Sequence, residues 1–406
     1  MIANPEVEAN LLAAQSVTSP AGLARLRELL QQVDWRKLIQ FAQLHGTTQL
    51  LARRLETLNV RPEGEPAAVL SSLVLRNSTR AFIHYRETRR VLNALTSAGI
   101  TALAYKGVVL SLQLYGRVNV RISSDIDILV AQRDVARALE VLAGLGYSRS
   151  GHTTVSDDVR FECSYEIALE NAQTRCTVEL QWRVAPKFAS CGFDSATEAL
   201  QPAALQSDPN VMTLADEDLI LALAHHGLAH CWDSLKWVAD IESFLRRTDV
   251  NWAAVAARAK KARSTDVLMT AASVAKHLFG VDIPEALGTP SRRAMAAARR
   301  LTRFVVAQHR VGDLESFWIQ LTLRETLKDR LQFVRYVCTP KPRDLSEKPF
   351  WALPRVLQPM LRPLRLLIES HSGNKRMLCD AQKVTEWEGD HEPQRLDRAA
   401  TPGMRP

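Results

Sequence analysis

The chain has 406 residues, a formal net charge of +8, 46% hydrophobic residues and 24% charged residues, an ordinary composition for a globular protein. This length accommodates two or three domains, and no apolar run reaches the roughly 18 residues that a transmembrane helix needs. The N-terminus has no basic segment followed by a long apolar one, so we expect no signal peptide.

The cysteines indicate the cellular compartment of the protein, and the charge indicates the kind of partner it binds. The 6 cysteines are scattered without a CxxC pair, which is typical of reduced thiols and predicts a cytoplasmic protein. The basic excess favours anionic partners such as nucleotides. No tract mixes basic and aromatic residues, so the sequence contains no specific DNA-binding motif.

Residues 1–98 are expected to form an N-terminal helical region. Asp34 is a predicted N-cap, and it precedes apolar residues at helical spacing: Trp35, Leu38, Ile39 and Ala42. Ala67–Ser97 is expected to form one long helix or two, ending at Ala98-Gly99. The predicted role of this region is structural packing.

Residues 99–185 are expected to form an α/β core. Ile100–Tyr105 predicts a short buried strand, Lys106-Gly107 a turn, and Val108–Leu114 a helix. A strand, a glycine turn and a helix N-terminus together form a site for phosphate, because free backbone N–H groups point outward there.

The run SSDIDILV predicts the next strand. Alternate side chains of a strand share a face, so Asp125 and Asp127 should point the same way. Two adjacent carboxylates repel each other unless a cation lies between them, and oxygen ligands of this kind suit Mg²⁺. The alternative is a strand end with two solvated acids.

After a predicted helix capped by Asp134, Cys163–Glu170 and Arg175–Trp182 predict two strands of a hairpin. Closure through Ala172-Gln173 would place Glu166 directly opposite Glu179. Facing like charges destabilise a sheet, so either one of them points to a cation or the register differs. We interpret Glu166 as a solvated charge at the sheet edge.

Residues 186–211 are expected to be an irregular linker, and residues 212–337 a C-terminal helical domain. If His225–Ile241 is one helix, His226 and His230 share a face and Lys236 lies on another. Three alternatives remain: a zinc site at the two histidines, a helix that lines a cleft, and simple packing.

Residues 338–406 form a basic, proline-containing tail. Its end, Gly389–Pro406, is expected to be disordered. Leu353–Ile368 is interpreted as an amphipathic helix that packs on the protein, or alternatively touches a membrane surface.

The motifs of the core resemble those of the DNA-polymerase-β-like nucleotidyltransferases, and most closely the branch described as uncharacterised nucleotidyltransferases. The family pattern is K-G, then Y, then R-x-x-S/D-D-I-D-x-L-V. This chain matches it with Lys106, Gly107, Tyr115, Arg121, Ser124, Asp125 and Asp127. A later V-E-L-Q-W motif supplies Glu179, with Gln181 in place of the family's usual histidine. Val108 replaces the hydroxyl residue that generally follows the glycine.

The resemblance implies an α+β fold with a polymerase-β-like core flanked by helical regions. It also implies an enzyme that moves an NMP from an NTP to an unknown hydroxyl acceptor, which is a small molecule, RNA or protein. The implied cofactor is Mg²⁺, with Mn²⁺ as the alternative ion, held by Asp125, Asp127 and Glu179 as metal-binding and catalytic residues. The implied nucleotide-binding residues are Lys106, Gly107, Arg121, Ser124, Lys236 and His230. The alternatives are an inactive nucleotide-binding module of the same fold and a metal-dependent hydrolase that uses the histidine segment.

Overall fold

The computed structural model describes residues 4–149, 161, 164–187, 189–190, 193–307 and 311–339. The expectations for Leu353–Ile368 and Gly389–Pro406 therefore lie outside the described residues.

The N-terminal region is helical, as predicted. Its helices are α1 (Pro5–Ala14), α2 (Pro20–Leu30), α3 (Trp35–Leu44), α4 (Thr48–Leu58) and α5 (Gly64–Ser97). Asp34 is the N-cap of α3, and its carboxylate accepts hydrogen bonds from the backbone of Arg36 and Lys37.

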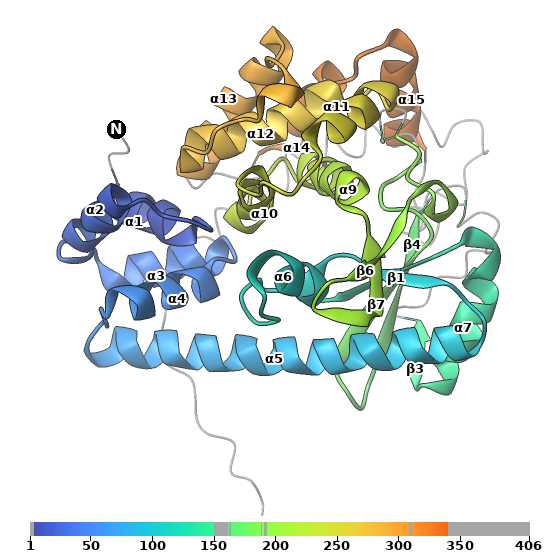
Figure 1. Ribbon diagram of the computed structural model, residues 1–406, viewed down its shortest axis with the longest axis horizontal. Coiled ribbons are helices and arrows are strands. Elements are labelled where there is room, and N and C mark those ends of the chain that lie inside the picture. Colours follow the sequence, from blue (N-terminus) through green and yellow to red (C-terminus); the bar gives the residue numbers. More distant parts are fainter. Residues whose placement is uncertain are drawn as a thin grey trace, which may run out of the picture.

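Helix α5 is a single helix of 34 residues that joins the N-terminal helices to the sheet (Figure 1). Near its start, Leu70 and Leu73 pack with the buried residues of α2 to α4. Near its end, Val91 and Leu95 pack beneath the sheet. Two separate apolar stretches of this helix therefore serve two hydrophobic cores, and the buried side chains between them include the polar residues His84, Glu87 and Thr88.

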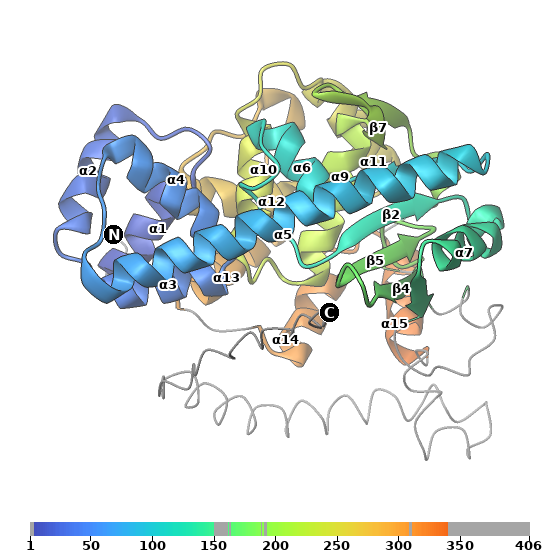
Figure 2. The ribbon, with the colours of Figure 1, turned by 90° about the horizontal axis from the view of Figure 1, so that it is seen from below.

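A five-stranded mixed sheet lies beside the C-terminal half of α5, away from α1 to α4 (Figure 2). Its strands are β1 (Ala102–Ala104), β2 (Ile126–Val130), β3 (Tyr147–Arg149), β4 (Glu166–Asn171) and β5 (Cys176–Gln181), in the order β1-β2-β5-β4-β3. The β2–β5 pair is parallel, and the other pairs are antiparallel. Helix α6 (Gly107–Tyr115) connects β1 to β2, and η1 (Gln132–Asp134) with α7 (Val135–Gly144) follows β2.

The alternation of β2 divides its side chains between two cores. Ile126, Ile128 and Val130 pack with residues of α5 and α7. Leu129 packs instead with the C-terminal helices, so Asp127, two residues earlier, lies on that second face. The acidic face of the sheet is therefore turned toward the C-terminal helical region.

The hairpin register predicted from the sequence is wrong. Glu166 pairs with Gln181, and Glu179 pairs with Ala168, so the two glutamates do not face each other. The loop has four residues rather than two, because the Asn171 side chain accepts hydrogen bonds from the backbone of Gln173 and Thr174. This Asx-type turn shifts the pairing by one residue on each strand.

The expected irregular linker at 186–211 contains regular structure. Strand β6 (Pro202–Leu205) and strand β7 (Asp208–Leu214) form a second, two-stranded sheet, after the short helix η2 (Thr197–Ala199). Leu205 and Val211 pack with the core under the five-stranded sheet. The Asp208 carboxylate also accepts a hydrogen bond of 2.5 Å from the Tyr85 hydroxyl of α5, which fixes the hairpin in place.

The C-terminal region is helical. It contains α9 (Asp216–Ala229), α10 (Leu235–Leu245), α11 (Trp252–Lys261), α12 (Thr265–Phe279), η3 (Glu285–Leu287), α13 (Arg292–Val306), α14 (Asp313–Thr322) and α15 (Leu327–Cys338). Within the described ranges, no helix combines the length and the apolar character needed to cross a membrane.

The single helix expected over 225–241 is interrupted. Helix α9 ends at Ala229 and α10 begins at Leu235, with Cys231 and Trp232 in the left-handed backbone region between them. The Trp232 backbone N–H donates to the Gly227 carbonyl, and a Cβ on Gly227 would lie only 2.1 Å from the Trp232 ring nitrogen. Glycine at this position therefore lets the indole fold back onto α9.

Candidate active site

A cluster of carboxylates lies on the face of the sheet that is turned toward α9 and α10. Asp127 of β2 is the register partner of Glu179 on the parallel strand β5. Glu166 of β4 joins them from the next strand, opposite Gln181. Three neighbouring strands therefore each contribute one acidic side chain.

The Gln181 amide connects these three acids. Its Nε2 lies 3.1 Å from Asp127 Oδ1, 3.0 Å from Glu166 Oε2 and 3.2 Å from Glu179 Oε2. The Tyr105 hydroxyl donates to Gln181 Oε1 at 2.6 Å, and both side chains are completely buried. Because the hydroxyl occupies the amide oxygen, the amide nitrogen faces the carboxylates.

Lys106 neutralises part of the cluster. Its Nζ lies 2.7 Å from Asp127 Oδ1, and the side chains are 9% and 3% exposed, respectively. Burial alone would lower the pKa of Lys106, but the Asp127 carboxylate outweighs it and raises the pKa well above the usual value. Lys106 is therefore charged at neutral pH.

The Lys106-Gly107 turn packs directly on the segment that carries the acidic pair. Gly107 has φ +56°, and a Cβ there would lie 3.0 Å from Ser123 Oγ and 3.3 Å from the Asp125 carbonyl oxygen. Glycine is needed here because both the positive φ and the short distances to the neighbouring atoms disfavour a side chain. The hydroxyls of Ser123 and Ser124 lie 3.1 Å from the two carboxylate oxygens of Asp125 and donate to them. The turn at the start of α6 and Asp125 thus form one compact unit.

Arg121, like Lys106, is paired with a buried carboxylate, but its partner lies on the C-terminal helices. Its Nε lies 2.9 Å from both carboxylate oxygens of Asp240 on α10. The two side chains are 5% and 1% exposed, so this is a buried ion pair that ties the β2 segment to the C-terminal helices. In this arrangement a main contact of Arg121 is a protein carboxylate.

Breaking this ion pair is expected to destabilise the fold. Asp240→Asn should lower the free energy of unfolding by about 3 kcal/mol, because it leaves a buried guanidinium without its counter-charge. The paired change Arg121→Met with Asp240→Leu should recover much of that loss. Denaturant titration of the three proteins measures this, and equal losses in the single and double variants would contradict it.

A group of rings and one lysine lies across from the carboxylates. The His226 and His230 rings are 4.8 Å apart, and the Trp237 ring lies 5.4 Å and 4.7 Å from them. Although α9 ends at Ala229, the turn that follows it leaves these three rings in contact. Burial lowers the pKa of His230, and the charges of Lys106 and Lys236 lower it further. Both histidines are therefore neutral at neutral pH.

Lys236 connects this group to the N-terminal helices. Its backbone N–H donates to the His45 carbonyl, and its aliphatic stem lies on Gly46, where a Cβ would be 2.8 Å from Lys236 Cδ. Burial lowers the pKa of Lys236, as does the nearby Arg121, while Asp240, Asp125 and Asp127 act in the opposite direction. Lys236 is therefore close enough to the acidic pair to interact with it electrostatically.

Burial and, after it, repulsion between carboxylates raise the pKa values of Glu179 and Glu166 in the cluster. Burial raises the pKa of Glu179 to about 8, and the carboxylates of Glu166, Asp127 and Asp125 add to the shift. Burial likewise raises the pKa of Glu166. A bound cation would reverse this repulsion.

The stability of the metal-free protein is expected to depend on Glu179 and pH. The raised pKa means that the folded state holds its proton more tightly than the unfolded state, whose pKa is near the usual 4.5. The stabilisation present below that value is lost as pH rises toward about 8. In EDTA, Glu179→Gln should raise the melting temperature by about 2 to 5 °C near pH 8 and leave it unchanged near pH 5.

The matched control for this experiment is Glu198→Gln, which removes an exposed carboxylate. It should keep the wild-type pH dependence. If the plots of melting temperature against pH run parallel for Glu179→Gln and the wild type, the pKa of Glu179 is not raised in the folded protein.

The number and type of carboxylate ligands in the cluster are compatible with Mg²⁺. Among the residues that the structure describes, no three His, Cys, Asp or Glu side chains are close enough to enclose a metal ion by themselves. Mg²⁺ usually takes only one or two carboxylates and completes its octahedron with water and substrate phosphates. Asp125 and Asp127 supply that number, whereas a zinc site at His226 and His230 needs a third protein ligand.

The structure brings together most of the residues singled out from the sequence. Asp127, Glu179 and Lys106 meet directly or through Gln181, and Gly107, Ser124 and Asp125 adjoin them. The interpretation of Glu166 as a solvated charge at the sheet edge was wrong. Its carboxylate lies 3.0 Å from Gln181 Nε2 and belongs to the cluster. Its place on the same sheet face as Gln181 was the available signal, but reading it required the correct register.

These features define an α+β protein in which a small mixed sheet presents acidic side chains beside a lysine–glycine turn at a helix N-terminus. The family model described as "Uncharacterised nucleotidyltransferase" matches residues 31–280, and the chain belongs to this family of nucleotidyltransferases. The resemblance to the uncharacterised nucleotidyltransferases, inferred from the sequence motifs, is thereby confirmed. A search of curated proteins finds no match.

Proposed function

We propose that this protein is a Mg²⁺-dependent enzyme that transfers an NMP from an NTP to a hydroxyl acceptor. The observation that carries the proposal is the packing of the Lys106-Gly107 turn on the Asp125 segment, next to the parallel pair Asp127–Glu179. A helix N-terminus, which is the kind of site that binds phosphate, and a carboxylate cluster are thereby adjacent, and this supports phosphoryl chemistry.

In this proposal each residue has a distinct task. Asp125 and Asp127 would hold Mg²⁺, or Mn²⁺ as the alternative, and Glu179 would help to hold a second ion. When bound, these ions supply charge neutralisation for both the attacking and the leaving oxygen. Lys106 and the N–H groups at the start of α6 bind phosphate oxygens as negative charge develops.

The reaction is an in-line displacement. The acceptor oxygen forms a bond to the α-phosphorus, the bond from that phosphorus to the bridging oxygen breaks, and pyrophosphate leaves. A carboxylate of the cluster receives the acceptor proton. Ser123 places a hydroxyl beside Gly107, near the turn where Val108 replaces the hydroxyl residue of the family pattern.

The rings of His226, His230 and Trp237, together with Lys236, are proposed to complete the nucleotide site. His230 and Trp237 provide flat surfaces for a base or acceptor, and Lys236 provides positive charge near the acidic pair. Arg121 acts in this proposal through the shape of the site, because its ion pair with Asp240 fixes α10 against the β2 segment.

Nucleotide binding is expected to depend on Lys106. Lys106→Met should weaken Mg·NTP binding by about 1 to 3 kcal/mol, because a charge-assisted phosphate contact is lost. Calorimetry with the four NTPs measures this, and Lys261→Met, at an exposed lysine of α11, is the control that should bind normally. Equal affinity in both variants would remove Lys106 from the nucleotide site.

An inactive nucleotide-binding module of the same fold is the second candidate, favoured by the Gly107-Val108-Val109 sequence. It predicts the same binding results but no labelled product in a transfer assay. Binding and transfer measurements together therefore separate the two candidates.

A further inference from the structure

Helices α14 and α15 present an apolar surface to solvent. They are joined by the short connection 323–326, and the Phe317 and Phe333 rings contact each other across them, with centroids 5.7 Å apart. Five large apolar side chains on these helices keep 37% to 72% of their surface exposed, and they define what we call the α14–α15 face: Leu314, Trp318, Leu327, Leu331 and Val334.

The two helices are firmly attached to the protein by their other sides. Ile319 of α14 and Leu323, which directly follows it, are buried in the core of the C-terminal helices. On α15, Phe333 is buried and Asp329 forms an ion pair of 2.9 Å with Arg263. The α14–α15 face is therefore the outer side of two anchored helices.

The exposed positions follow the period of a helix. On α14 two of them are four residues apart, and on α15 three of them are separated by four and by three residues, so each set forms a stripe. Single exposed apolar side chains are common on protein surfaces. Stripes on two adjoining helices are instead typical of a surface that a partner covers.

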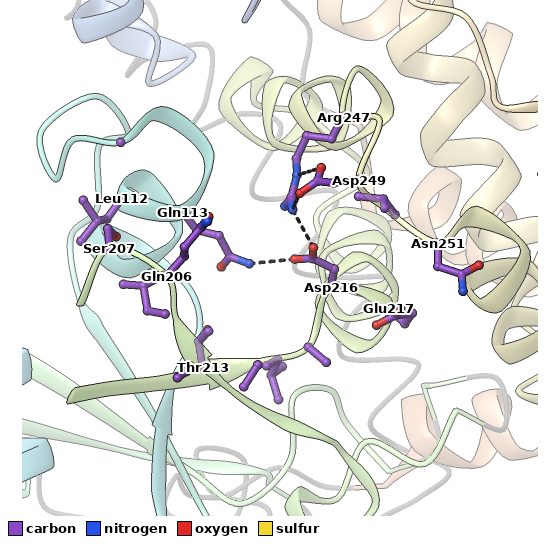
Figure 3. A pocket seen from close by; sticks show the side chains of 17 residues that line it. Leu112, Gln113, Gln206, Ser207, Thr213, Asp216, Glu217, Arg247, Asp249 and Asn251 are labelled. Atoms are coloured by element: carbon purple, nitrogen blue, oxygen red, sulfur yellow. Dashed lines mark hydrogen bonds and ion pairs between the residues drawn. The ribbon is translucent and has the colours of Figure 1, made fainter. Parts of the chain in front are cut away.

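The end of α6 shows how other elements of this protein are joined. Figure 3 shows Gln113 of α6 and Arg247 reaching Asp216, at the start of α9, from two sides, each at 2.8 Å. These side chains pair with one another, so contacts within the described chain already connect the elements that meet there. Among the residues that the structure describes, no element covers the α14–α15 face in this way.

The sequence that follows α15 supplies an occupant for this face. Residues 340–406 continue directly from it, and nine of the 16 residues in Leu353–Ile368 are Leu, Ile, Val or Met. Such a segment gains free energy when its side chains leave water. It also contains Pro354, Pro359 and Pro363, which restrict the backbone and so reduce the entropy that is lost when the segment is held against a surface.

The connection between α15 and this segment is short enough to favour docking within one chain. Residues 340–352 span about 40 Å when extended, which exceeds the length of α15 itself, about 18 Å. The segment therefore reaches every part of the α14–α15 face. A tether of this kind gives an effective concentration that is roughly millimolar, so the segment has an advantage over a separate partner of the same chemistry.

We propose that Leu353–Ile368 docks on the α14–α15 face of its own chain. Its apolar side chains cover Trp318, Leu327 and Leu331, which removes apolar surface on both sides from water. The arginines of the segment stay at the solvent side of the contact. This inference stands independently of the nucleotide-transfer proposal.

The test is hydroxyl-radical footprinting of the full chain, read for each residue by mass spectrometry. In the double variant Leu357→Asp with Leu361→Asp, Trp318 should be labelled several-fold faster than in the wild type, because the buried charges release the segment from the face. The control, Gln358→Asp with Ser370→Asp, adds the same charge at polar positions and should keep the wild-type rate. Equal labelling of Trp318 in the wild type and the Leu357/Leu361 variant would overturn the proposal.

A reciprocal variant changes the face instead of the segment. Leu327→Ser with Leu331→Ser replaces exposed side chains, so the protein should remain folded. Hydrogen exchange of the amides in 353–368 should become several-fold faster in this variant. Unchanged exchange in that segment would place it elsewhere and overturn the proposal.

The same footprinting separates the other possible occupants. Protection of Trp318 that is lost on dilution by about a hundredfold would identify a second copy of the chain. Protection that appears only with vesicles of anionic lipid would identify a membrane surface. Either result would overturn docking within one chain, which predicts protection that is independent of concentration and of lipid.

Discussion

Asp125→Asn is expected to abolish nucleotide transfer while the protein remains folded. Loss of one Mg²⁺-binding carboxylate removes several kcal/mol of charge stabilisation from the transition state, which corresponds to a rate loss of at least about a thousandfold. The amide keeps the size of the carboxylate; its oxygen accepts from one of the two serine hydroxyls, Ser123 or Ser124, and its NH₂ group donates to the other. The unfolding transition should therefore change little.

Asp125 is a cleaner test than Asp127. Asp127→Asn should abolish transfer as well, but it also leaves the buried Lys106 ammonium without its counter-charge and should destabilise the protein. Glu198→Asn, an exposed substitution, serves as the control for both. Full transfer activity in the Asp125 variant would show that this carboxylate holds no catalytic ion.

Gln181→Leu is expected to have the second large effect, on stability. The leucine keeps most of the volume of the glutamine, but its side chain donates no hydrogen bond to Asp127, Glu166 and Glu179. The amide nitrogen carries two hydrogens, so two hydrogen bonds to the cluster are lost. At about 1.5 kcal/mol each, the metal-free protein should lose about 3 kcal/mol of stability.

Tyr105→Phe provides a graded comparison with Gln181→Leu. It removes only the hydroxyl that orients the amide, so about 1 kcal/mol should be lost. Addition of Mg²⁺ should restore part of the stability of both variants, because a cation replaces the missing donor. Chemical denaturation with EDTA or with Mg²⁺ measures these differences. Equal stability of Gln181→Leu and the wild type in EDTA would contradict the proposed bridging role.

Local sequence patterns predicted the parts of the site that depend on neighbouring residues. The alternation of the SSDIDILV run predicted a strand with one acidic face, and Lys106-Gly107 predicted the turn into α6. These features need only backbone geometry and the steric freedom of glycine.

The features that sequence reasoning missed depend on tertiary contacts. The position of Glu166 follows from a four-residue turn, and a different turn length would have moved it away from Gln181. The break between α9 and α10 follows from the indole of Trp232 packing on Gly227. Both features involve residues close together in the sequence. However, the residue types alone specify neither the length of the turn nor the packing of the indole.

The role of Arg121 shows the same limit over a longer distance. A basic residue next to an acidic motif suggests phosphate binding, yet its carboxylate partner Asp240 lies 119 residues further along the chain. Only the packing of α10 against the β2 segment brings them together. The sequence predicted which residues gather at the site better than it predicted which of them pair.

Transfer of label from α-³²P NTPs directly tests whether the protein is a nucleotidyltransferase. The purified protein is incubated with each NTP, Mg²⁺ and a cell lysate as the source of acceptor, in parallel with Asp125→Asn. With one NTP, a new labelled product is expected that requires Mg²⁺ and is absent with the variant. If every NTP binds and none yields a labelled product beyond that formed by the Asp125 variant, the protein is not a nucleotidyltransferase of the kind proposed.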